Sequence, residues 1–333
     1  MPSRRRSCRS DPTTVQEMEP QLHEHEHGKL TVVGSINVDL TWTLGIAAQV
    51  SSPISPGYTW SATSRQGLGG KGANAAIYAA GLHGPIVELI GAIGDDHLAS
   101  FCRSELQRAG ITLTLEEHAD TTTGRAGIIS DHRGQNLIAV DLGANQLLTP
   151  GFVEANMEET LPAPSVIVTN FEIGPEAALA TANFALRHRI TLIVDPSPLN
   201  QVDAFAPVLE QASILLPNEL EYEILQRDYS ELLDRQQLLG GYVAVTLGER
   251  GVDIYHQHVL AQHFDALAVP VADSIGAGDC FTATLGACLA LGIDRNEAFQ
   301  LATTAASLST QGFGAQGYLP TLREAYAARQ GLQ

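Results

Sequence analysis

The stretch LTVVGSINVD, residues 30–39, sets the pattern for the whole chain. Its β-branched start predicts a buried strand that ends at Gly34. Asn37 and Asp39 alternate beyond the strand, so we expect their side chains to point to one side. An amide and a carboxylate in that position suit the vicinal hydroxyls of a polyol, although the same residue types also form ordinary turns.

Outward from this stretch, short apolar runs alternate with helical patterns. Further strands are expected at 87–90, 166–169, 192–194, 214–216 and 243–245, and helices at 72–82, 97–108, 175–187, 276–291 and 296–309. Strands that alternate with helices indicate βαβ units. The predicted fold class is therefore α/β, with a mostly parallel central sheet and helices on both faces.

Two stretches interrupt the alternation, at about 40–66 and 121–140. Each holds two extended segments around a polar turn, which predicts an antiparallel strand pair. We interpret them as a small antiparallel β lid that projects from the central sheet. Surface hairpins without function are the alternative.

Composition excludes several classes of protein. The chain has 333 residues and a net charge of −18, which argues against nucleic acid as a partner because phosphate backbones require clustered Lys and Arg. No apolar run has the length of a membrane-spanning helix. Four scattered cysteines without a Cys-x-x-Cys pair favour reduced thiols and a cytoplasmic protein. Residues 1–28 lack an apolar signal segment and are expected to be a disordered leader.

Only two of the basic residues are lysines, and we place Lys29 in the ragged leader region. Lys71 lies in Gly-Gly-Lys-Gly-Ala-Asn, residues 69–74, at a predicted helix start with Asn74 on the first turn. A compact ammonium group there suits a phosphate or a sugar oxygen. Residues 67–72 also match G-x-G-x-x-G, but they do not close the first strand–helix unit, which argues against a dinucleotide site.

The strongest chemical signal is DSIGAGD, residues 273–279. Gly276, Ala277 and Gly278 allow backbone N–H groups to converge at a helix start, which forms an anion hole. Asp279 beside it can take a proton from an attacking hydroxyl while the amides stabilise a transferring phosphoryl group. A simple helix cap is the alternative.

Two further motifs follow predicted strands. Asn218 and Glu221 lie three residues apart, so they can hold hydrated Mg²⁺ near a triphosphate or form a capping box. The stretch TLGERG, residues 246–251, predicts a turn that could lie along a nucleotide.

Taken in order, these motifs resemble the ribokinase branch of the PfkB carbohydrate kinase family, over roughly residues 30–322. The motifs that carry the resemblance are residues 34–39, 69–74, 143–145 (Gly-Ala-Asn), 217–219 (Pro-Asn-Glu), 246–248 and 276–279. The resemblance implies a ribokinase-like three-layer α/β/α kinase domain over 29–333. It implies ATP-dependent phosphorylation of D-ribose at O5. A kinase of another sugar or nucleoside, such as 2-deoxyribose, and a non-catalytic sugar-binding protein on the same fold are the alternatives.

The resemblance also assigns roles to single residues. The sugar would be bound by Asn37, Asp39, Gly70, Lys71, Asn74, Glu172 and Asp279. Asp279 would be the catalytic base, with Gly276, Ala277 and Gly278 as the anion hole. ATP would be bound by Asn218, Glu221, Thr246, Gly248, Gly251 and Gly278, and Glu221 would also hold Mg²⁺ through water. K⁺ would be held by Asp273, Ile275, Ser309, Gly312, Gly314 and Tyr318.

The resemblance further implies a homodimer formed through the lid. Two departures from the family pattern stand out. Tyr318 occupies a position where a small hydroxyl residue is frequent. In the lid, Pro56 and Gly57 are kept, but Tyr58 replaces the usual acidic residue.

Overall fold

The computed structural model describes residues 28–44, 61–130, 136–159 and 163–331. Nearly all of the expected leader lies outside these ranges, as do residues 45–60 and 131–135 of the expected lid. The prediction of a disordered leader therefore stays a prediction. Tyr58, the residue of the lid that departs from the family pattern, also lies outside the described residues.

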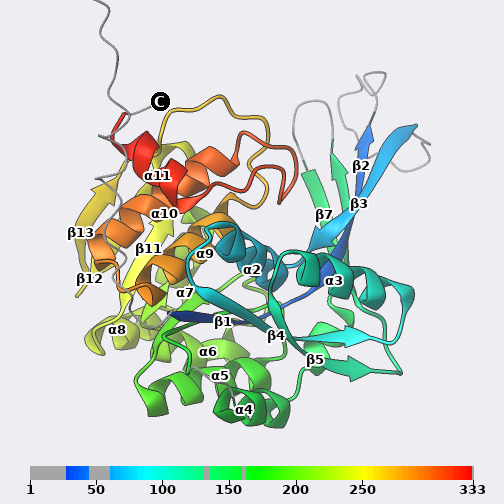
Figure 1. The fold of residues 1–333 in the computed structure, drawn as a ribbon. Helices are drawn as coiled ribbons and strands as arrows, with labels where there is room; N and C mark the ends of the chain where they lie inside the picture. The colour runs from blue at the N-terminus through cyan, green and yellow to red at the C-terminus, as the bar shows by residue number, and fades with distance from the viewer. Residues whose placement is uncertain (1–27, 45–60, 131–135, 160–162, 332–333) are drawn as a thin grey trace, which may run out of the picture.

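A nine-stranded sheet forms the centre of the molecule, in the order β13-β12-β11-β10-β9-β8-β1-β4-β5 (Figure 1). Seven neighbouring strands run parallel, and β12 and β13 add an antiparallel edge. This confirms the mostly parallel sheet, although the sequence does not predict β5, β12 or β13. The strands are β1 (Lys29–Val33), β4 (Ile86–Gly94), β5 (Thr112–His118), β8 (Val166–Asn170), β9 (Thr191–Asp195), β10 (Ile214–Leu215), β11 (Tyr242–Thr246), β12 (Val252–His256) and β13 (Val259–Phe264).

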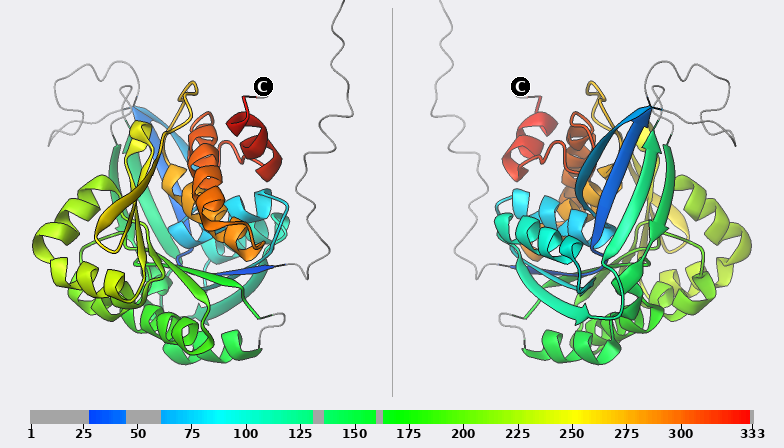
Figure 2. Two further views of the ribbon diagram at one scale, coloured as in Figure 1. Left: turned by 90° about the vertical axis from the view of Figure 1, so that its left-hand side faces the viewer. Right: turned by 90° about the vertical axis from the view of Figure 1, so that its right-hand side faces the viewer.

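Helices cover both faces of this sheet, and the side views show the two layers (Figure 2). One face packs against α2 (Lys71–Gly81), α3 (His97–Arg108), α9 (Ala277–Ala290), α10 (Arg295–Ser309) and α11 (Leu322–Arg329). The other packs against α4 (Pro150–Glu159), α5 (Pro175–His188), α6 (Val202–Gln211), α7 (Glu219–Asp228) and α8 (Ser230–Leu238). Each face of the sheet has its own hydrophobic core. Successive residues of β1 pack in different cores, Val32 against the first set of helices and Val33 against the second. The predicted three-layer α/β/α architecture is confirmed.

The second sheet, which we call the lid, projects from the body in the order β3-β2-β6-β7 (Figure 1). It consists of β2 (Asn37–Leu44), β3 (Ala62–Gly69), β6 (Gly124–Ser130) and β7 (Asn136–Asp141). Each hairpin is antiparallel, as predicted, and a parallel pairing of β2 with β6 joins the two hairpins. The lid strands start closer to the body than expected, so Asn37 and Asp39 belong to a lid strand.

The assignment of Lys29 to the leader is wrong. Lys29 is the first residue of β1, and its Nζ lies 2.8 Å from Oε2 of Glu88, with both side chains 5% exposed. Glu88 also accepts hydrogen bonds from the hydroxyls of Thr31 and Thr114. This ion pair therefore ties β1 to β4 inside the protein.

We expect Lys29→Met to lower the free energy of unfolding by roughly 3–5 kcal/mol, because the Glu88 carboxylate would stay buried without its counter-charge. Guanidinium unfolding at neutral pH measures the change. The double variant Lys29→Met/Glu88→Leu removes both charges and should recover most of the loss. Equal stability of the single variant and the wild type would contradict a buried ion pair.

Candidate active site

Five neighbouring parallel strands end at one edge of the sheet, and four of them end in, or lead to, a polar residue. Gly34 follows β1, Asn170 ends β8, Asp195 ends β9, Asn218 follows β10 and Thr246 ends β11. Asn170 and Asp195 are register partners, and Asn218 forms a bridge with Thr246. Ligands of open parallel sheets bind at this carboxyl edge. The edge therefore carries the candidate site.

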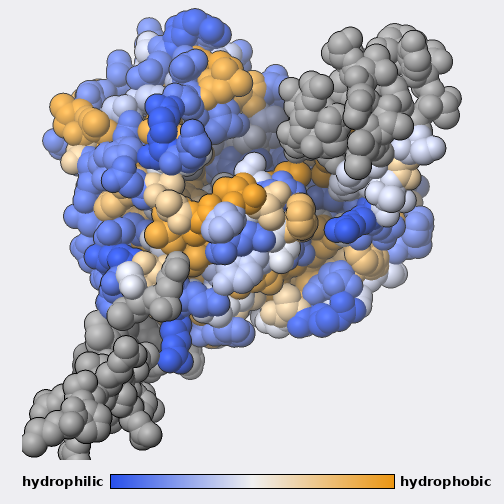
Figure 3. All heavy atoms as spheres, turned by 90° about the horizontal axis from the view of Figure 1, so that it is seen from above, coloured by the Kyte–Doolittle hydropathy of each residue, from blue (hydrophilic) through white to orange (hydrophobic). Residues whose placement is uncertain are grey.

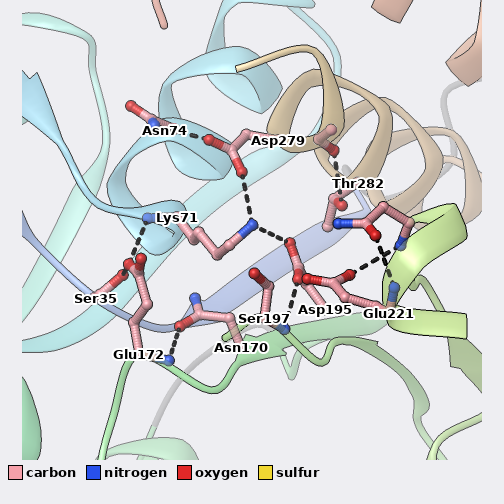
Figure 4. A network of polar contacts seen from close by, with 12 residues as sticks. Ser35, Lys71, Asn74, Asn170, Glu172, Asp195, Ser197, Glu221, Asp279 and Thr282 are labelled. Atoms are coloured by element: carbon pink, nitrogen blue, oxygen red, sulfur yellow. Dashed lines mark hydrogen bonds and ion pairs between the residues drawn. The ribbon is translucent and has the colours of Figure 1, made fainter. Parts of the chain in front are cut away.

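Lys71 opens α2 and reaches the middle of that edge (Figure 4). Its Nζ lies 2.8 Å from Oδ2 of Asp195 and 3.7 Å from Oδ1 of Asp279. Its backbone N–H donates to Oε2 of Glu172 at 3.1 Å. Burial alone would lower the pKa of Lys71, but the carboxylates of Asp195, Asp279 and Glu172 more than offset burial and raise it. The ammonium group is therefore charged.

Asp279 lies on the first turn of α9 and is 8% exposed. Its Oδ2 accepts a hydrogen bond from Nδ2 of Asn74 at 2.8 Å, and Oδ1 of Asn74 accepts one from Nε2 of Gln316 at 2.8 Å. Burial raises the pKa of Asp279 to about 6, although the Lys71 ammonium lowers it and Asp195 raises it further. The Asp279 carboxylate is therefore held in place and is more basic than that of an ordinary aspartate.

The turn before Asp279 is shaped for close approach of a ligand. Gly276 caps α9 with φ 83°, and a Cβ atom there would lie 2.6 Å from the carbonyl oxygen of Ala315, so only glycine fits. A Cβ at Gly278 would meet no described atom within 4 Å. N–H groups at a helix start carry partial positive charge, and here that of Ala277 donates to the carbonyl oxygen of Ser274 at 3.3 Å. The arrangement suits a phosphoryl group.

The residues expected to bind a sugar come from the lid and the body. The pKa of Asp39 on β2 is raised to about 7, mainly by burial and further by the negative charges of Glu172 and Asp279. Asn37 is 2% exposed, and its Oδ1 accepts a hydrogen bond from Nδ2 of Asn145 at 2.8 Å. The structure brings Asp39, Glu172 and Asp279 together, whereas the Asn37 side chain is tied to a buried neighbour.

The nucleotide candidates lie farther along the edge. The backbone N–H of Asn218 donates to Oε2 of Glu221, and that of Glu221 donates to Oδ1 of Asn218, both at 2.9 Å. The capping-box alternative is therefore observed, and a role toward Mg²⁺ stays a prediction. Gly248 and Gly251 have φ of 60° and 94°, and a Cβ at Gly251 would lie 1.9 Å from the carbonyl oxygen of Phe264. Close packing against β13 is thus enough to explain why position 251 is a glycine.

Asp273 joins the two loops expected to hold a monovalent cation. Its Oδ1 accepts from the N–H of Ile275 at 3.0 Å and its Oδ2 from the N–H of Gly314 at 2.9 Å. The hydroxyl of Tyr318 donates instead to Oε1 of Glu324 at the start of α11. Within the described ranges, no group of three or more His, Cys, Asp or Glu side chains is placed to hold a metal ion. Any cation here would rely mainly on backbone carbonyls.

An open cavity of about 800 Å³ lies between the lid and the loops at 271–275 and 313–317. Seen from above, this face of the molecule mixes hydrophilic residues with an apolar band across its middle (Figure 3). Asp39, Thr41 and Arg65 line the cavity on the lid side, and Ser274 and Phe313 on the body side. Its volume is typical of small-molecule sites.

Sequence reasoning missed four residues of this network: Ser35, Asn145, Asp195 and Gln316. Ser35 donates to Glu172 at 2.5 Å, and Gln316 also donates to the carbonyl oxygen of Leu68. Asp195 had a visible signal, since it directly follows the apolar run at 192–194. Ser35 and Asn145 lie in quoted motifs, and Gln316 lies between the expected cation ligands Gly314 and Tyr318, but the partners of all three are distant in sequence.

Comparisons with known proteins agree with the fold. A family model described as pfkB family carbohydrate kinase matches residues 29–322. A ribokinase of Bacillus subtilis is 33% identical over 301 residues, which cover 89% of this chain and 97% of the relative. A deoxyribokinase of Salmonella typhi is 28% identical over 306 residues, with 89% and 96% covered. The solved structure of Arabidopsis thaliana ribokinase complexed with ribose and ATP has a TM-score of 0.74 and 25% identity, and the likeness covers 91% of this chain and 99% of that one.

The fold and these likenesses define an enzyme that phosphorylates carbohydrates. The chain belongs to the pfkB family of carbohydrate kinases. Among its described helices, none combines the length and apolar character needed to cross a membrane.

Proposed function

We propose that the protein transfers the γ-phosphoryl group of ATP to O5 of D-ribose, which gives D-ribose 5-phosphate and ADP. One observation carries the proposal: the buried Asp279 carboxylate lies on the first turn of α9, directly after the Gly276–Gly278 turn, and a helix start of this kind suits a phosphoryl group. The ribokinase names of the relatives support ribose as the acceptor.

In this mechanism Asp39, Lys71, Asn74 and Glu172 hold the sugar with its 5-hydroxyl toward Asp279. Asp279 takes the hydroxyl proton as O5 attacks phosphorus, the new O5–P bond forms, and the bond from phosphorus to the leaving ADP oxygen breaks. The N–H groups at the start of α9 stabilise the charge on the transferring group. A base with a pKa of about 6 is ionised at neutral pH and accepts a proton more readily than an ordinary aspartate.

The donor sets suit two cations. Glu221 would hold Mg²⁺ through water beside Asn218, and the ion would offset phosphate charge. Carbonyl oxygens of Ile275, Ser309, Gly312 and Gly314, with the Asp273 carboxylate, are hard oxygen donors of the kind a K⁺ ion needs. The Tyr318 hydroxyl is left out of this set because it donates to Glu324.

We also propose a single kinase domain over 29–333, a cytoplasmic protein and a homodimer formed through the lid. Apolar side chains on the lid support the dimer, since Leu137 and Ile138 of β7 are each 51% exposed. Apolar surface of this kind favours contact with a second chain.

The first test is a panel of acceptors with coupled detection of ADP. We expect kcat/KM for D-ribose to exceed that for 2-deoxyribose by at least about tenfold, because the missing hydroxyl leaves buried polar groups unpaired. Fructose and nucleosides, which are larger than ribose, complete the panel. A preference for 2-deoxyribose would move the assignment to that sugar, as the Salmonella typhi relative allows. Ribose binding without ATP turnover would contradict an enzyme.

Asp279→Asn should lower kcat by about three orders of magnitude or more, because the amide cannot accept the hydroxyl proton. Isothermal titration should show ribose binding largely kept. In the wild type, activity should fall as pH drops through about 6, because the base must be ionised and burial raises its pKa to that value. The exposed Asp203→Asn on α6 is the matched control. Near-wild-type turnover of Asp279→Asn would remove it as the base.

K⁺ should raise kcat several-fold above a Na⁺ or choline control at equal ionic strength. The physical reason is that a bound cation would order the loops that Asp273 joins, and these lead into α9. Asp273→Asn should lose this activation. Equal values of kcat in K⁺, Na⁺ and choline salts would contradict a monovalent cation site.

A further inference from the structure

We propose that Asp195 is a positioning residue, which holds the Lys71 ammonium group away from the carboxylate of Asp279 and so leaves that carboxylate free to take a proton. The inference rests on the proposed role of Asp279 as the base. Neither the family motifs quoted above nor the sequence pattern assigns a role to Asp195.

The two carboxylates compete unequally for the same ammonium group. Nζ of Lys71 lies 2.8 Å from Oδ2 of Asp195, which is the length of a charge-assisted hydrogen bond. The distance from Nζ to Oδ1 of Asp279 is 3.7 Å, beyond hydrogen-bond range. Lys71 is therefore bonded to Asp195 and only near Asp279.

The backbone holds the Asp195 carboxylate in place. Asp195 ends β9, which pairs with β8 on one side and β10 on the other, and it is 8% exposed. Its Oδ1 accepts a hydrogen bond from the N–H of Ser197 at 3.0 Å while Oδ2 accepts from Lys71. Because each oxygen has its own donor, the carboxylate presents Oδ2 to Lys71 in a fixed direction.

The same arrangement leaves one oxygen of Asp279 for the reaction. Its Oδ2 accepts from Asn74, so Oδ1 is the oxygen that faces Lys71 across 3.7 Å (Figure 4). Without Asp195, the ammonium group would have only the remaining carboxylates to pair with, and Asp279 is the nearest to its Nζ. Lys71 would then donate to Oδ1, occupy its lone pair and weaken the base.

Charged groups from several elements act on Asp279. Lys71 of α2 favours its ionised form, whereas Asp195 of β9, Glu172 after β8 and Asp39 of the lid strand β2 disfavour it. Loss of Asp195 removes one negative charge and also lets the positive charge approach. Both effects lower the pKa of Asp279, so they shift a pH profile in one direction.

The test is the pH profile of kcat for Asp195→Asn, which keeps the shape of the side chain. We expect the acid limb to move down by about one pH unit or more, and kcat at high pH to fall about tenfold or more because the base is weaker and its oxygen is occupied. The KM for ribose should change less than kcat. A merely structural role would lower kcat without moving the limb.

A second variant separates the two effects. In Lys71→Met/Asp195→Asn the ammonium group is absent, so the acid limb should return toward or above the wild-type position, even if binding of the sugar suffers. Asp195→Ser should shift the acid limb of the pH profile in the same direction as Asp195→Asn. It replaces Asp195→Asn in the experiment if that variant does not fold. Asp203→Asn on the exposed face of α6 should leave the profile unchanged.

Two outcomes overturn the proposal: a limb at the wild-type pH in both Asp195 variants, or no return of the limb in the double variant. These results differ from failure of the proposed function. If Asp279→Asn is active, Asp279 is not the base and the proposed mechanism fails. If Asp279→Asn is inactive while the Asp195 variants keep the wild-type limb, only the role of Asp195 fails.

Discussion

The ammonium group of Lys71 is the interaction on which the site depends. It hydrogen-bonds to Asp195 at the end of β9 and lies near Asp279 on α9, while the backbone of the same residue donates to Glu172 after β8. Carboxylates from three distant parts of the chain would repel one another in a buried site. One compact cation among them offsets that repulsion and brings a sheet edge and two helices to a common point.

The lid is built into the same arrangement. β3 ends at Gly69 and α2 begins at Lys71, so a single residue, Gly70, separates the lid from the helix that carries the cation. Gly70 has φ 88°, and a Cβ atom there would lie 2.8 Å from the backbone nitrogen of Asn37 on β2. A Cβ at Gly69 would overlap the Asp39 carboxylate. Because β2 and β3 of the lid meet at this turn, the lid and Lys71 are not positioned independently.

The central strands and the main helices could be predicted, because buried parallel strands are continuous apolar runs and the helices between them are amphipathic. The β12–β13 hairpin could not, since its turn places Gln257 and His258 at positive φ and lacks the usual Asn-Gly or Asp-Gly signal. Within the site, residues that belong to motifs, such as Lys71, could be identified from the sequence. Asp195 follows a visible apolar run but was not assigned a role, because its pairing with Lys71 arises only in the fold, where β9 lies between β8 and β10.

The misplacement of Lys29 has a physical explanation that also bears on Lys71. The ion-paired arginines among the described residues have side chains 33–70% exposed, whereas the two lysines, at 5% and 25%, are paired inside the protein. A guanidinium group carries five donors in a rigid plane, whereas an ammonium group is a compact point charge with three donors on a slim stem, which fits a narrow space between carboxylates. This chain thus uses lysine where a cation must lie among buried carboxylates. An apolar pattern cannot show this, because Glu88 and Asp195 are distant in sequence from their lysines and only the fold pairs them.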